Sequence, residues 1–173
     1  MAGNGNIDFF CLECYTDKSE VNTLQTEVIK IDRENMDLDA LKRAGEILKS
    51  GGLVAFPTET VYGLGGDGLH EESSRKIYEA KGRPSDNPLI VHVADMEHLE
   101  KIVKKVPKAA YKLAEAFWPG PMTMILEKND LVPYGTTGGL DTVAIRMTSD
   151  PIALELIRQG GGYIAAPSAN TSG

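Results

Sequence analysis

The chain has little of several features that mark large classes of proteins. It holds 18 Lys and Arg residues against 25 Asp and Glu residues, a formal net charge of −7 at pH 7. A protein with this balance has no general basic field that would attract nucleic acid or an anionic membrane. Any site for an anion must therefore be local, built from a few converging cations and backbone amides.

Long apolar runs and a secretory leader are missing as well. The longest apolar stretches have the length of a strand and are well short of a membrane span. The first residues, MAGNGNIDFF, lack the basic-then-apolar pattern of a signal peptide. We therefore expect a soluble, cytoplasmic protein that makes no contact with a membrane.

Cysteine is scarce, because the chain has only Cys11 and Cys14, in one C-x-x-C. A zinc site would need a second pair of ligands, and none of the three histidines stands at metal-ligand spacing to this pair. A redox C-x-x-C normally follows a strand and opens a helix, and that pattern is missing here. The pair is interpreted as incidental, and no metal site is predicted.

The common nucleotide and nucleophile motifs are also missing. There is no G-x-x-x-x-G-K-[ST] and no G-x-S-x-G, which excludes a P-loop and a nucleophile elbow. Gly63 to Gly68 formally matches G-x-G-x-x-G, but a polar segment separates it from the apolar strand before it, which argues against a dinucleotide site. Ser168 lies in a Pro-Ser-Ala-Asn turn without an obvious partner base, so we expect no acyl-enzyme chemistry.

What the chain does contain is an alternation of strand and helix patterns. Its 173 residues, 42% of them hydrophobic, are enough for one core. Residues 1–25 have no clear period and are predicted to be an N-terminal extension to a single domain over residues 26–173. Within that domain the patterns predict strands at 26–31, 53–56, 89–93, 122–126 and 142–147 and helices at 38–50, 71–81, 96–103, 107–117 and 150–159. This order predicts an α/β (α+β) fold, a mixed sheet with flanking helices.

Strand alternation places polar side chains on one face of this sheet. Thr142, Ala144 and Arg146 share the face opposite the core residues of their strand, and the small Ala144 leaves room for a ligand. His92 likewise faces away from its apolar neighbours. In an extended Pro-Thr-Glu-Thr segment, Glu59 would point away from Thr60. The polar face is therefore a candidate binding surface.

Two interpretations of these polar residues remain open at this point. An arginine in so apolar a segment needs an anionic partner, because an unpaired buried guanidinium is costly. That partner could be a ligand, or an Asp or Glu of the chain in an internal salt bridge. A lone histidine such as His92 is more often a hydrogen-bonded core residue than a ligand-binding one.

Several stretches, taken together and in order, carry a family resemblance. They are G-G-L-V-A-F-P-T-E-T-V-Y-G-L-G (51–65), the K-x-R of Lys81 and Arg83, N-P-L-I-V-H-V (87–93), F-W-P-G-P-M-T (117–123), V-A-I-R (143–146) and P-S-A-N-T-S-G (167–173). From about residue 26 to its last residue, the chain resembles the YrdC/Sua5 family, the L-threonylcarbamoyladenylate synthases.

The resemblance implies both a fold and a reaction. The family fold is an open, twisted α/β sheet with a large concave cleft. The reaction condenses L-threonine, bicarbonate and ATP into threonylcarbamoyl-AMP and pyrophosphate, for the t6A37 modification of tRNA. A separate tRNA threonylcarbamoyl-transferase complex receives the product, so no strong direct nucleic-acid binding is expected. Mg²⁺ is expected to arrive with ATP, since the chain has no visible carboxylate cage.

The resemblance also implies roles for individual residues. Lys81 and Arg83 would be the catalytic cations. Threonine would be bound by Thr60, His92, Arg146 and the backbone at Ala166. ATP would be bound by Arg83, Asn87, Thr142, Ser168 and Asn170.

One departure from the family lies at the end of the chain. The sequence stops at S-A-N-T-S-G, where family members continue with a strand-borne Ser/Thr motif and an arginine that help to hold ATP. The C-terminal part is therefore missing relative to the family. This implies a nearly complete threonine pocket, an incomplete nucleotide pocket and impaired synthase activity.

The sequence argues against two other function classes. An RNA-binding module would need clustered Lys and Arg, and the acidic composition argues against it. A carbamoyl-transfer or hydrogenase-maturation domain contains a similar module. The short length, and the absence of zinc-finger cysteine pairs and of an acylphosphatase-like segment, argue against that class.

Overall fold

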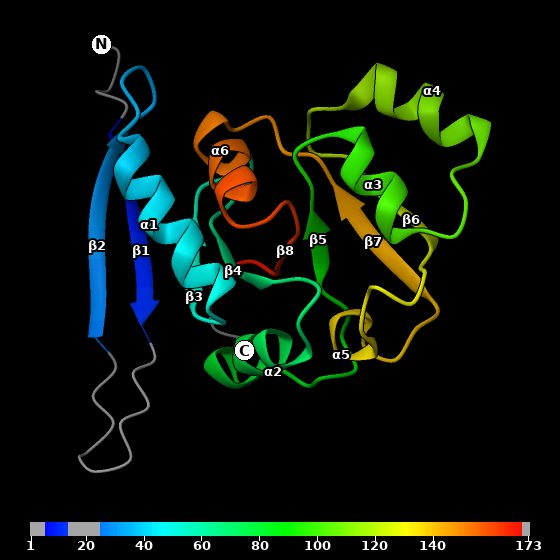
Figure 1. Cartoon of the computed structure of the whole chain (residues 1–173), viewed down its shortest axis with the longest axis horizontal. Helices are drawn as coiled ribbons and strands as arrows, with labels where there is room; N and C mark the ends of the chain where they lie inside the picture. The colour runs from blue at the N-terminus through cyan, green and yellow to red at the C-terminus, as the bar shows by residue number, and fades with distance from the viewer. Residues whose placement is uncertain (1–5, 14–24, 171–173) are drawn as a thin grey trace.

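The structure, a computed structural model, describes residues 6–13 and 25–170, with side chains from residue 26 onward (Figure 1). The described strands are β1 (Asn6–Glu13), β2 (Gln25–Asp32), β3 (Leu53–Phe56), β4 (Gly63–Asp67), β5 (Ile90–His92), β6 (Thr123–Glu127), β7 (Thr142–Arg146) and β8 (Ile164–Ala166). The described helices are α1 (Leu38–Lys49), α2 (Glu71–Lys81), α3 (Met96–Ile102), α4 (Lys108–Phe117), α5 (Tyr134–Thr137) and α6 (Pro151–Gln159).

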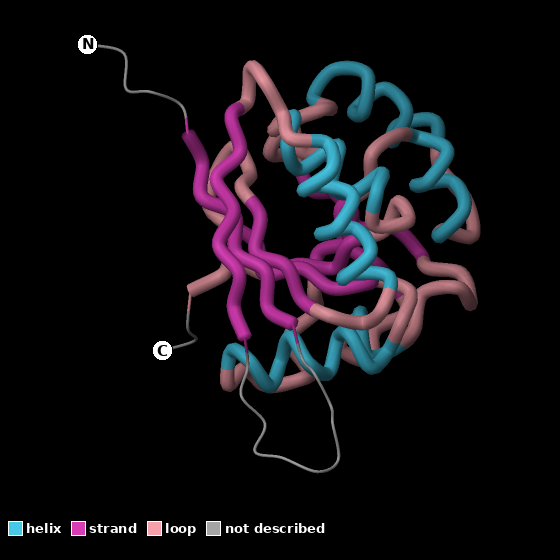
Figure 2. The backbone as a smooth tube through the Cα atoms, turned by 60° about the vertical axis from the view of Figure 1, so that its left-hand side comes forward, coloured by secondary structure: helices cyan, strands magenta, loops and turns pink. Residues whose placement is uncertain are grey.

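The strands form one twisted mixed sheet (Figure 2). Its order is β2-β1-β3-β4-β8-β5-β7-β6. β5 and β7 run parallel, and the other neighbouring pairs are antiparallel. The predicted mixed α/β fold with flanking helices is therefore confirmed.

Aspartate side chains cap three of the described helices, α1, α3 and α6. The Asp37 side chain accepts a hydrogen bond from the N–H of Ala40 at 2.9 Å, and the Asp95 side chain accepts one from His98. Asp150 caps α6 by accepting from the N–H groups of Ile152 and Ala153. A side-chain oxygen at this position satisfies amides that have no partner within the helix.

Apolar clusters on the two faces of the sheet decide where a ligand could lie. One cluster joins α1 and α6 to β3 and β8, and includes Phe56 and Ile164. Another cluster joins α3 and α4 to the Val91 face of β5 and the Ile145 face of β7. The predicted core faces of β5 and β7 are confirmed, because Val91, Val143 and Ile145 are fully buried. The side chains of His92 and Arg146 point to the opposite face of the sheet, where the candidate site lies.

The first strand was not predicted. β1 lies between β2 and β3 and is antiparallel to both, so part of the segment predicted to be an extension without regular structure belongs to the sheet. That part of the prediction was wrong, while the division of the chain at residue 25 stays a prediction. The interpretation of the cysteine pair cannot be followed, because Cys14 lies outside the described residues.

The glycine-rich stretch after β3 forms strand β4 rather than a phosphate-binding loop. Gly65 shows why glycine is needed there. A Cβ at this position would lie 2.6 Å from Cγ2 of Ile164 and 2.8 Å from Cε1 of Phe56. The glycine lets these two core side chains close over the strand, which is a packing role.

Candidate functional site

The candidate site begins with two residues at the ends of adjacent parallel strands. His92 ends β5, Arg146 ends β7, and the two are register partners. On the other side of β7, Thr123 of β6 is the register partner of Arg146. Register partners place their side chains on the same face of a sheet. A polar row of three side chains therefore crosses the sheet at this level.

The loop between β3 and β4 brings Thr60 and Glu59 to this row. Nη2 of Arg146 lies 3.4 Å from Oγ1 of Thr60 and 3.0 Å from Oε1 of Glu59. The prediction that Glu59 points away was wrong, because the loop is bent rather than extended. The Thr58 hydroxyl donates to the carbonyl of Val61 at 2.6 Å and accepts from the amides of Thr60 and Val61. Threonine hydroxyls that bond to the nearby backbone favour turns, so Thr58 is a residue type from which a bent loop could have been predicted.

The internal salt-bridge interpretation of Arg146 is thus correct in part. The carboxylate of Glu59 receives Arg146 on one oxygen and the hydroxyl of Thr148 on the other, at 2.5 Å. Burial opposes ionisation of Glu59, but the hydrogen bonds from Thr148 and Arg146 outweigh it and hold the pKa of this carboxyl below its ordinary value. Glu59 is therefore a site residue that the sequence analysis missed.

His92 is a buried, neutral member of the row. It is 4% exposed, and the edge of its ring meets Phe56 with the ring centroids 5.7 Å apart. Burial, followed by the positive charge of Arg146, lowers the pKa of His92 to about 4. The imidazole can therefore form hydrogen bonds at pH 7 without adding charge.

Two buried nitrogen atoms in this row have no hydrogen-bond partner among the described residues. They are Nδ1 of His92 and Nε of Arg146. Buried polar atoms in proteins are nearly always hydrogen-bonded, and leaving one unpaired costs about 1–3 kcal/mol. Two such atoms on register partners indicate a place where a polar ligand would complete the bonding.

The predicted ATP residues gather at the other end of the same strands. Asn87 precedes β5 and Thr142 begins β7, so both lie at the N-terminal end of this parallel pair. Ser168 follows β8, which is antiparallel to β5, so β8 finishes at that same end of the strands. Thr142 and Arg146 stand four positions apart on β7, about 13 Å. Ala166 pairs with Ile90 between the two ends.

Lys81, the last residue of helix α2, reaches the same end of the strands. Its side-chain ammonium donates to the carbonyl oxygen of Ser168 at 2.6 Å and also to that of Asn170. Lys81 is 6% exposed, and burial followed by the charge of Arg83 lowers its pKa below the ordinary value. The structure therefore brings Lys81 together with the turn that contains Ser168 and Asn170.

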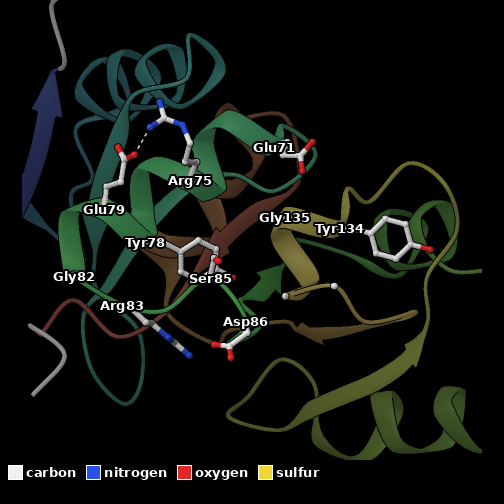
Figure 3. A pocket seen from close by; sticks show the side chains of 12 residues that line it. Glu71, Arg75, Tyr78, Glu79, Gly82, Arg83, Ser85, Asp86, Tyr134 and Gly135 are labelled. Carbon is white, nitrogen blue, oxygen red and sulfur yellow. Dashed lines mark hydrogen bonds and ion pairs between the residues drawn. The ribbon is translucent and has the colours of Figure 1, made fainter.

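Arg83 turns toward a separate cavity of about 850 Å³ (Figure 3). Its lining residues come from α2, from the loop that follows and from the region of α5: Glu71, Arg75, Tyr78, Glu79, Gly82, Arg83, Ser85, Asp86, Tyr134, Gly135, Gly138 and Gly139. Nε of Arg83 is buried and has no hydrogen-bond partner within the described part of the chain. Thr60, His92 and Arg146 lie elsewhere, so this cavity is not the predicted threonine pocket.

Two kinds of feature are absent from residues 6–13 and 25–170. No group of three or more His, Cys, Asp or Glu side chains there could hold a metal ion. No helix in that part of the chain has both the length and the apolar character to cross a bilayer.

Comparison with known proteins places the chain in a family. Residues 46–173 match the Sua5/YciO/YrdC family model, whose description is "Telomere recombination". The threonylcarbamoyl-AMP synthase of Pyrococcus abyssi is 53% identical over 141 residues, which are 82% of this chain and 42% of that protein. The Bacillus subtilis protein of the same name is 54% identical over 134 residues, 77% of this chain and 39% of that protein.

Solved structures agree with these matches. The P. abyssi Sua5 structure complexed with L-threonine shares 52% identity with a TM-score of 0.79, covering 80% of this chain and 41% of that one. Escherichia coli YciO shares 25% identity with a TM-score of 0.69, covering 77% of this chain and 65% of that one. The chain thus spans about two fifths of the length of the first two curated relatives. On the match of its residues 46–173, it belongs to the Sua5/YciO/YrdC family.

Proposed function

We propose that the chain acts as an L-threonylcarbamoyladenylate synthase, a nucleotidyltransferase that condenses L-threonine, bicarbonate and ATP. The observation that carries this proposal is the pair of buried nitrogens without partners, Nδ1 of His92 and Nε of Arg146, beside Thr60. A guanidinium is suited to a carboxylate, and a neutral imidazole and a hydroxyl are suited to the polar groups around it. The relatives named threonylcarbamoyl-AMP synthase, and the relative solved with L-threonine, support this assignment.

The proposed reaction requires two anions to meet. The amine of threonine takes up CO₂ with release of a proton, or bicarbonate with release of water, to give a carbamate. A carbamate oxygen then attacks the α-phosphorus of ATP while the bond to the bridging oxygen breaks, and pyrophosphate leaves. Fixed cations and hydrogen-bond donors lower the repulsion and orient the reactants.

The two ends of the polar face suit the two reactants separately, threonine at one end and ATP at the other. Arg146, His92 and Thr60 would hold threonine at one end, with its carbamate directed past the backbone at Ala166. At the other end, Lys81 would neutralise the charge of the carbamate, and ATP would be held by Arg83, Asn87, Thr142, Ser168 and Asn170. Mg²⁺ would arrive bound to ATP and neutralise part of the phosphate charge.

The product would pass to a tRNA threonylcarbamoyl-transferase complex in the cytoplasm. A net charge of −7 argues against tight direct binding of tRNA by this chain. Filter binding at low salt checks this point. Tight, salt-sensitive tRNA binding without ATP would contradict the assignment and favour an RNA-binding module.

The reaction itself can be tested on the 173-residue chain. The chain is incubated with L-threonine, ¹⁴C-bicarbonate, Mg-ATP and pyrophosphatase, and the nucleotides are separated by chromatography. We expect a labelled adenylate that disappears when threonine is omitted, formed more slowly than by the B. subtilis relative, which is the reference enzyme. Label that enters an adenylate without threonine would contradict the proposed function.

A further inference from the structure

Glu59 stands at the centre of a chain of contacts that the proposed reaction does not use directly. Its side chain is 18% exposed and that of its partner Arg146 is 10% exposed. Both carboxylate oxygens are occupied, one by Arg146 at 3.0 Å and the other by the hydroxyl of Thr148 at 2.5 Å. An exposed surface pair contributes little to stability and leaves both side chains mobile. This pair is partly buried and is held on both sides.

The contacts of Thr148 anchor Glu59 to regular structure. Thr148 is fully buried, and its hydroxyl oxygen accepts from the N–H of Asp150 at 3.2 Å. Asp150 in turn caps helix α6 and pairs with Arg33 at 2.6 Å. The carboxylate of Glu59 is therefore fixed relative to the end of β7 and the start of α6, although it belongs to a loop.

This anchoring determines how Arg146 is presented. Nη2 of Arg146 is directed to Glu59 and Thr60, while Nε is buried and has no partner. Arginine has a long side chain with many rotamers, and ordering it costs free energy that a binding site must supply. If Glu59 orders it in advance, a ligand carboxylate meets a guanidinium that already has the required orientation.

We propose that Glu59 is a positioning residue of the threonine site. It acts through Arg146 and through the loop that carries Thr60, and it orients both for the carboxylate of the amino acid. The inference rests on the proposed function. The opposite role, an anion that competes with threonine for Arg146, predicts the opposite sign of the effect on affinity.

The test measures threonine binding to the 173-residue chain by calorimetry, without ATP, for Glu59→Gln, Thr148→Val and the double variant. We expect Glu59→Gln to weaken threonine binding about tenfold and Thr148→Val to weaken it less, in the same direction. The double variant should bind as weakly as Glu59→Gln alone, because Thr148 acts through Glu59. The matched control is Glu115→Gln, which removes an exposed carboxylate on α4.

A second measurement needs no ligand. The Nε–H group of Arg146 gives its own signal in ¹⁵N relaxation experiments, and we expect Glu59→Gln to increase its motion. Threonine affinity that stays the same or rises in Glu59→Gln would overturn the proposal. Failure of the unaltered chain to bind threonine would contradict the proposed function instead, and the Arg146 signal would still decide whether Glu59 orders the guanidinium.

Discussion

Lys81 and Ser168 are joined by a hydrogen bond of 2.6 Å, from the ammonium of one to the carbonyl of the other. The contact closes a long stretch of chain, from the end of α2 to the turn after β8. That turn is also held to the β4 side, since the amide of Ala169 donates to the carbonyl of Tyr62 at 2.7 Å. The lysine therefore both supplies a cation and fastens the segment that would bind ATP.

The first prediction concerns this contact. Replacing Lys81 by Met keeps the packing of the aliphatic stem but removes the donor to Ser168 and Asn170. We expect faster hydrogen exchange at the amide of Ala169, because the turn loses one of its attachments. ATP affinity should fall in the same variant.

Lys76→Met is the matched control for that variant. Lys76 lies on the same helix and donates to the carbonyl of Gly51 at 2.7 Å. The substitution therefore removes a lysine–carbonyl hydrogen bond that is far from the turn at Ala169. Exchange at Ala169 should stay unchanged in the control. Equal exchange in both variants would show that Lys81 does not hold the turn.

The second prediction concerns Arg146. Arg146→Ala should weaken threonine binding by about 2–4 kcal/mol, because a charge-assisted partner is lost. Calorimetry measures the affinity, and thermal unfolding checks that the chain remains folded. Arg158→Ala removes an exposed arginine that pairs with Glu155 within α6, and it should leave the affinity unchanged. Arg146 is not part of the site if its variant binds threonine as well as the unaltered chain does.

The third prediction concerns the pH dependence of stability. The pKa of His92 is about 4 in the folded chain, against an ordinary 6.5. Between about pH 4 and pH 6.5, the unfolded chain therefore binds a proton at His92 that the folded chain does not bind. The contribution to stability is complete above about pH 6.5 and falls as the pH drops toward 4, by about 3 kcal/mol in total.

Urea unfolding between pH 7 and 4 measures this contribution. His92→Gln cannot titrate, so the free energy of unfolding should fall less over this range than it does in the unaltered chain. Identical pH profiles for His92→Gln and the unaltered chain would show that this histidine is not buried as described.

The fourth prediction concerns the packing of α1 against α6. A Cβ at Gly45 would lie 2.5 Å from the backbone carbon of Gln159, so Gly45→Ala forces the two helices apart. We expect a loss of about 1–3 kcal/mol in the free energy of unfolding, as for other overpacked cores. Thermal or urea unfolding measures it.

Gly82→Ala is the comparison for this change. Gly82 has φ = 60°, and an added Cβ would meet no atom within 4 Å, so only backbone strain is introduced. A loss of about 1 kcal/mol is expected there. A Gly45→Ala variant as stable as the unaltered chain would show that the helices can separate at no cost.

Local geometry explains what could be predicted from the sequence. The predicted helix starts at residues 38, 71 and 96 depend on residues within one turn of each helix, and all three are confirmed. The alternation that separates Val143 and Ile145 from Arg146 depends only on the period of a strand. The family resemblance implies that Thr60 and Arg146 share a threonine site, and in the structure Nη2 of Arg146 lies 3.4 Å from Oγ1 of Thr60.

The amino-acid sequence by itself therefore determined the approximate limits of every described helix except α5, the buried faces of β5 and β7, and the polar face that carries the candidate site. Only the tertiary structure decided that Glu59 turns toward Arg146, that β1 enters the sheet between β2 and β3, and that Lys81 binds the carbonyls of the turn after β8. The physical reason is distance along the chain. A cap or a strand face depends on neighbouring residues, whereas these contacts depend on a bent loop, a sheet order and a helix position that become defined only when the whole core packs.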